Sequence, residues 1–130
     1  MMATTTPKLT EVRCAAAPPA GGHYAQGVLH GNTLHISGQL GVTRDTPGAE
    51  AVPVAEQVAV ALGNVELIAR VIGAARRRRE MHRVRGRHPA WDEANRAYAA
   101  FFGTHRPARS VVPCGTLHFG AKVEIVAVGG

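Results

Sequence analysis

The chain has 130 residues, which is enough for one domain with a hydrophobic core but leaves few residues to spare. We therefore expect a single domain over residues 1–130. No apolar run reaches the roughly 20 residues that a transmembrane helix needs, which argues against a membrane-spanning segment. The net charge of +6 suggests a nucleic-acid-binding protein at first sight. However, residues 73–89 hold seven arginines and one glutamate. This stretch alone therefore carries the whole net positive charge, and the rest of the chain has a net charge of zero.

The first 19 residues are rich in Thr, Ala and Pro, and they lack the basic start and compact apolar run of a signal peptide. The two cysteines, Cys14 and Cys114, lie far apart and form no CxxC pair. We therefore expect reduced thiols and a cytoplasmic protein.

In the first half of the chain, residues 10–14 are compatible with a short strand. Residues 26–30 and 33–37 are β-prone runs separated by Gly31-Asn32, which predicts a hairpin with a tight turn. Residues 38–50 are rich in Gly, Asp, Thr and Pro and predict a loop.

Apolar residues recur at three- and four-residue spacing between Val54 and Ile72, which predicts a helix that Gly73 ends. A second helix is expected over residues 91–102, with Ala94, Ala97, Tyr98 and Phe101 on its buried face and Gly103 at its end. Residues 109–112 and 122–128 are expected to be the closing strands; Val123, Ile125 and Ala127 alternate along the last one.

A further strand between the helices would complete two ββαβ-like halves. The fold predicted is then α+β, a single-layer sheet with two helices packed on one face. Such a sheet leaves its other face uncovered, and sister subunits in a closed ring would bury that face.

Four stretches of the chain carry recognisable motifs: residues 22–26 (Gly-His-Tyr-Ala-Gln), 31–40 (Gly-Asn-Thr-Leu-His-Ile-Ser-Gly-Gln-Leu), 95–110 (Asn-x-x-Tyr-x-x-Phe-Phe leading into Pro-Ala-Arg-Ser) and 120–125 (Gly-Ala-Lys-Val-Glu-Ile). Together, and in this order, they resemble the motifs of the RidA/YjgF family of enamine and imine deaminases. The resemblance implies a chorismate-mutase-like fold and a homotrimer with pockets between subunits. It also implies hydrolysis of 2-imino or 2-enamino acids without a metal or organic cofactor.

By this resemblance Arg109 binds the substrate carboxylate, and a guanidinium suits that task because it grips a carboxylate with two parallel hydrogen bonds. Glu124 takes the place of the glutamate that activates water. Four further residues would line the pocket: Tyr24, Gly38, Asn95 and Val111, the last at a position where some relatives have a cysteine.

Simpler roles remain open for these residues. Arg109 could form a surface ion pair, Glu124 could face solvent, and Tyr24 could only pack. None of the seven histidines is paired at metal-ligand spacing, and Cys114 is expected to be structural. Two departures from the family pattern, His23 for a proline and Val126 for a second acid, bear on the substrate rather than on the reaction class.

Residues 74–90 lack resemblance to the family, which has a central strand here. Arg83, Arg85 and Arg87 alternate, but the residues between them supply no apolar face, so the stretch is a poor interior strand. Codons can be chosen for residues 80–89 (GAG ATG CAC CGT GTA CGT GGC CGA CAT CCN) that, shifted by one base, encode Arg-Cys-Thr-Val-Tyr-Val-Ala-Asp-Ile, a typical strand. We therefore hypothesise a short out-of-frame stretch.

Two alternatives to this frame hypothesis are a solvated basic loop and an arginine arm that binds RNA. No aromatic residue lies between the arginines to stack on bases. The runner-up function is accordingly a non-catalytic regulator that binds a ligand or RNA.

Overall fold

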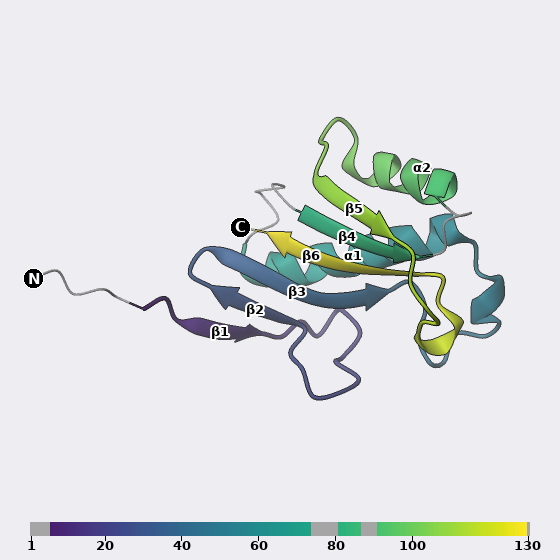
Figure 1. Ribbon diagram of the computed structural model, residues 1–130. Helices are drawn as coiled ribbons and strands as arrows, with labels where there is room; N and C mark the ends of the chain where they lie inside the picture. Colours follow the sequence, from purple (N-terminus) through teal and green to yellow (C-terminus); the bar gives the residue numbers. More distant parts are fainter. Residues whose placement is uncertain (1–5, 74–80, 87–90, 130) are drawn as a thin grey trace, which may run out of the picture.

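The computed structural model describes residues 6–73, 81–86 and 91–129, and over residues 81–86 it describes the backbone. They form one six-stranded sheet, two α-helices and two short 3-10 turns (Figure 1). The strands lie in the order β1-β2-β3-β6-β4-β5. The elements are β1 (Leu9–Val12), β2 (Gly27–His30), β3 (Thr33–Leu40), η1 (Ala49–Ala51), α1 (Val54–Val71), β4 (Met81–Gly86), α2 (Trp91–Phe102), β5 (Ala108–Val112), η4 (His118–Gly120) and β6 (Val123–Gly129).

The hairpin of β2 and β3 confirms the predicted turn. Gly31 has φ +60°, a conformation that glycine adopts without steric cost, and His30 pairs with Thr33 across the two-residue loop. The prediction that a loop begins at residue 38 is wrong, because β3 continues to Leu40. Its pairing with β6 shifts register between Ile36 and Gln39, and this irregularity places Gly38 within the strand.

Strand β4 lies inside the sheet, antiparallel to β6 and parallel to β5. In this register Arg83 stands opposite Val126, and Arg85 stands opposite Glu124. A central strand is therefore present where the family resemblance implies one, and the interpretation of this stretch as a loop is wrong for these six residues. Residues 74–80 and 87–90, which the frame and RNA-arm hypotheses also cover, lie outside the described residues.

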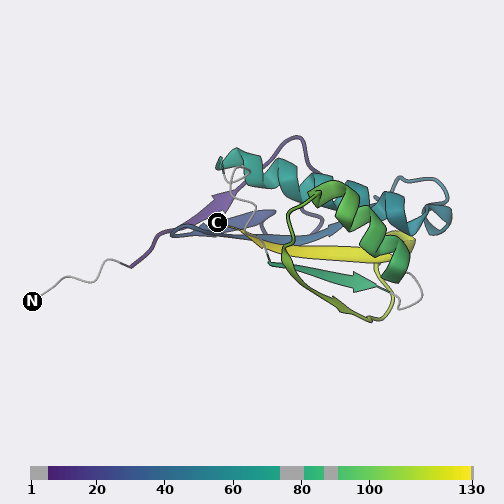
Figure 2. The same cartoon turned by 90° about the horizontal axis from the view of Figure 1, so that it is seen from above.

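Both predicted helices are confirmed. The backbone leaves α1 through Gly73, which has φ +74°, and it leaves α2 through Gly103, which has φ +63°. Helices commonly end with a left-handed glycine at this place. Figure 2 shows the two helices on the same side of the sheet.

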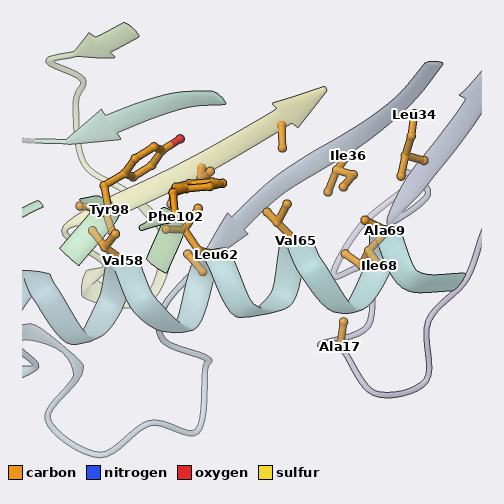
Figure 3. Packing of buried hydrophobic residues seen from close by; sticks show 14 of the residues in the cluster. Ala17, Leu34, Ile36, Val58, Leu62, Val65, Ile68, Ala69, Tyr98 and Phe102 are labelled. Atoms are coloured by element: carbon orange, nitrogen blue, oxygen red, sulfur yellow. The ribbon is translucent and has the colours of Figure 1, made fainter. Parts of the chain in front are cut away.

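The core lies between the sheet and the helices. Figure 3 shows the apolar stripe of α1 packed against β3, with Tyr98 and Phe102 of α2 beside it. From β6, Val123, Ile125 and Ala127 point into this core. One prediction needs correction: Phe102 is buried more completely than Phe101, which only packs against the edge of the core.

The other face of the sheet is not covered by any helix of the described chain (Figure 2). Val126 and Val128 of β6 alternate with the core residues and so belong to this open face, where they are only half-buried. Val112 of β5 is 46% exposed. In the described ranges no helix is both long and apolar enough to cross a membrane.

Candidate active site

Arg109 lies on β5, the edge strand next to β4, and its side chain is half-buried. Its Nη2 donates a hydrogen bond of 2.5 Å to Oδ1 of Asn95 on α2. The structure therefore brings together two of the residues that the sequence predicts for the site. Among the described residues, no Asp or Glu forms an ion pair with Arg109.

Two aromatic rings of α2 lie beside the same guanidinium. The Cζ atom of Arg109 is 4.9 Å from the ring centre of Tyr98 and 5.6 Å from that of Trp91. Both distances fall within the range of cation–π attraction. Among the described residues the guanidinium is held by one hydrogen bond and two ring faces, and no second hydrogen bond from its N–H groups is seen there.

Glu124 lies on β6 directly over Gly38 of β3. A Cβ atom on residue 38 would overlap the carboxylate of Glu124, with the carboxyl carbon 2.8 Å away. The predicted importance of Gly38 therefore has a physical reason in this chain, because only glycine leaves room for the carboxylate. The structure brings these two predicted residues together as a second group.

The two groups lie on opposite faces of the sheet within one chain. Arg109 is two residues before Val111 on β5, so both side chains lie on the same face of the sheet. Val111 packs against the core, and Arg109 contacts α2. Glu124 alternates with the buried residues Val123 and Ile125, so its side chain belongs to the open face. A site that uses both charges cannot be assembled within one face of a single protomer.

Tyr24 lies apart from both groups, in the loop before β2. This residue is 53% exposed, its hydroxyl accepts a hydrogen bond of 3.1 Å from the amide of Gly21, and its Cε1 lies close to Gly22. Val111 is on the same face of β5 as Arg109 but packs against the core. The chain alone thus places these two residues without joining them to Arg109 or Glu124.

No group of three or more His, Cys, Asp or Glu side chains in the described ranges is arranged to hold a metal ion. Cys14 is buried and Cys114 is partly buried, and both are free thiols. Arg109 and Glu124 are the two charged residues that the sequence predicts for this candidate site.

The sequence interpretation missed the contribution of two aromatic residues. It assigned Tyr98 to the core and Trp91 to the start of a helix, but both also contact Arg109. Their spacing was a signal that could have found them, because residues 91, 95 and 98 share one face of a helix. The position of Asn95 between the two rings follows from the same spacing.

Comparisons with known proteins agree with this fold. A family model described as Endoribonuclease L-PSP matches residues 14–129. The RutC family protein y4sK of Sinorhizobium fredii is 35% identical over 113 residues, which cover 86% of this chain and 90% of the relative. The 2-iminobutanoate/2-iminopropanoate deaminase of Bos taurus is 33% identical over 120 residues, covering 90% of this chain and 86% of the relative.

Among solved structures, the YjgF gene product of E. coli is similar with a TM-score of 0.81 and 31% identity, covering 92% of this chain and 97% of that one. The fold, the order of the sequence motifs and the family match over residues 14–129 all lead to the same assignment. The chain belongs to the RidA/YjgF family.

Proposed function

We propose that this protein hydrolyses 2-imino and 2-enamino acids to 2-oxo acids and ammonia. The bovine relative bears the name of an enzyme that acts on 2-iminobutanoate and 2-iminopropanoate, which supports the reaction class. The proposal depends chiefly on the placement of Arg109. Its guanidinium is oriented by Asn95 and has no described carboxylate partner, so it suits the carboxylate of a small acid.

Glu124 supplies the second half of the proposed chemistry. Hydrolysis needs a water oxygen to add to the carbon of the C=N bond while a proton moves to the nitrogen. The C–N bond of this tetrahedral intermediate then breaks to give the 2-oxo acid and ammonia. A carboxylate can take the proton from the water and deliver it to the departing nitrogen, which is ordinary general acid–base catalysis. An enamine substrate first gains a proton on carbon to become the imine.

We further propose that the site is completed between protomers of a homotrimer. Arg109 and Glu124 lie on opposite faces of one sheet, so a substrate that contacts both would take them from two chains. The open face with Val126, Val128 and Val112 supplies apolar surface that sister subunits would bury. Tyr24, exposed in its own chain, and Val111 would line this cleft together with Gly38 and Asn95.

The proposed reaction consumes only water and moves only protons, so we propose that it proceeds without a metal or organic cofactor. We also place it in the cytoplasm, where the free thiols of Cys14 and Cys114 would stay reduced.

The test generates 2-iminobutanoate enzymatically in solution and measures ammonia release above the spontaneous rate. The wild-type protein should accelerate hydrolysis, and Arg109→Ala and Glu124→Gln should both lose the acceleration. Arg96→Ala and Glu56→Gln are matched controls, because both side chains are exposed on α2 and α1 respectively, and they should retain the activity.

A wild-type trimer that leaves the spontaneous rate unchanged would contradict the proposal. The regulator alternative would then be favoured by RNA binding whose affinity falls steeply with rising salt concentration.

A further inference from the structure

We propose that Trp91 is a positioning residue, which together with Tyr98 fixes the orientation of the Arg109 guanidinium for a bound carboxylate. The inference deepens the proposed function and rests on it for the identity of the ligand. The contacts themselves are independent of that function: Trp91, Asn95 and Tyr98 reach Arg109 from one face of α2.

The three contacts constrain the cation in different ways. Asn95 fixes one terminal nitrogen through its hydrogen bond. The two ring faces attract the positive charge but bind no N–H group in a defined direction. The rings can therefore hold the guanidinium in place without using its N–H groups. A neighbouring carboxylate would instead accept hydrogen bonds from those groups and occupy them.

Burial separates the roles of the two rings. Tyr98 is only 4% exposed and belongs to the core, so its ring is needed for folding. Trp91 is 42% exposed at the first position of α2 and is not part of the core cluster. Within the described part of the chain, packing in the core cluster therefore does not account for the position of the indole, whereas attraction to Arg109 does. Replacing Trp91 should change the orientation of the guanidinium with little effect on folding.

Trp91 is also the only tryptophan in the chain, so tryptophan fluorescence reports on the surroundings of this one indole, which include Arg109. A carboxylate that binds the guanidinium neutralises the charge beside the indole. We expect 2-oxobutanoate, a member of the proposed product class, to change the emission of the wild-type trimer, and we expect Arg109→Ala to abolish the change.

The deciding experiment compares wild type, Trp91→Phe and Trp91→Ala in the assembled protein. Loss of the indole should weaken 2-oxobutanoate binding, measured by calorimetry, and raise KM by about three- to tenfold, with a smaller change in kcat. Trp91→Phe keeps a ring face and should recover most of the affinity. Thermal unfolding should be unchanged within about 2 °C, and the exposed Arg96→Ala on the same helix should behave as wild type.

A second measurement needs no ligand. Ring currents of Trp91 and Tyr98 should move the Arg109 Hε resonance upfield in NMR spectra, and Trp91→Ala should move it back. An unmoved resonance in Trp91→Ala would overturn the inference, as would wild-type affinity in that variant or a failure of Trp91→Phe to recover affinity. Absence of both ammonia release and 2-oxobutanoate binding in wild type, with the Arg109 Hε shift present, would refute the proposed function and leave the positioning role standing.

Discussion

The carboxylate of Glu124 occupies the space in which a side chain on residue 38 would begin. This relationship predicts that Gly38→Ala displaces the carboxylate. The overlapping atoms are the end of a flexible side chain, so the strand should survive while the proposed acid–base group moves. Because small misplacements of a reacting group are costly, we expect kcat to fall by about ten- to a hundredfold.

The measurement is steady-state ammonia release by Gly38→Ala beside its thermal unfolding. A double-mutant cycle with Glu124→Gln should be strongly non-additive, since both changes remove the same group. Wild-type kcat in Gly38→Ala would show that the position of this carboxylate is irrelevant to turnover.

Two further glycines, Gly41 and Gly63, separate the effect of close packing from that of helix propensity. A Cβ on Gly41 would overlap the backbone of Gln57 in α1, which cannot move without moving the helix. Gly63 lies inside α1, and apart from its chain neighbours and the helix's own backbone no described atom comes within 4 Å of the place where its Cβ would stand. We expect Gly41→Ala to lower the free energy of unfolding by about 3 kcal/mol or more. Gly63→Ala should raise it by up to about 1 kcal/mol. Denaturant unfolding measures both, and equal effects of the same sign would contradict this packing.

The opposite-face arrangement predicts complementation between two inactive variants. Each protomer of Arg109→Ala retains Glu124, and each protomer of Glu124→Gln retains Arg109. If the site joins the two residues across a subunit boundary, trimers reassembled from an equal mixture should have one intact site in four and regain about a quarter of wild-type activity.

The complementation assay refolds the mixture together, and each variant refolded alone is the control. If both residues act from the same chain, no mixture can contain an intact site and activity stays absent. Light scattering of the same samples should give three times the 13.7 kDa mass of the chain.

The arginine-rich stretch gives a prediction about the gene. If residues 80–88 are out of frame, the third bases of their codons will permit the hidden reading Arg-Cys-Thr-Val-Tyr-Val-Ala-Asp-Ile, and incompatible bases end the hypothesis. Substituting this peptide should also raise Tm by several degrees, because β4 is an interior strand and the hidden sequence has more residues that favour such a strand.

That substitution lowers the net charge by two, so neutralising the exposed Arg13 and Arg96 together is the matched control. The control should leave Tm nearly unchanged. Equal shifts in both variants would assign the gain to overall charge rather than to the strand.

Much of the fold was predictable because its signals are local. The apolar period of α1, the glycines at positions 73 and 103, and the Gly31-Asn32 turn each specify structure within a few residues. The extension of β3 through Gly38 was missed because glycine and the polar Gln39 indicate a loop by composition. Pairing with β6, which is remote in sequence, stabilises them in a strand.

The sequence predicted the residues of the site but not their arrangement in space. Family motifs supplied Arg109, Asn95, Gly38 and Glu124, and the structure joins them as two pairs. Sequence patterns could not show that the pairs lie on opposite faces, because this depends on the register of β5 and β6 relative to the helices. The contact of Trp91 with Arg109 likewise depends on how α2 lies against the sheet.

Strand β4 has a consequence that reaches beyond its own stability. In the described chain β5 is joined to the sheet only through β4, and β4 is in turn paired with β6. Strand β4 therefore sets how β5, which carries the cation, lies relative to β6, which carries the carboxylate. A fault in β4 would leave each pair of residues chemically whole, but it would displace the cation that one protomer presents to the carboxylate of its neighbour in the proposed trimer.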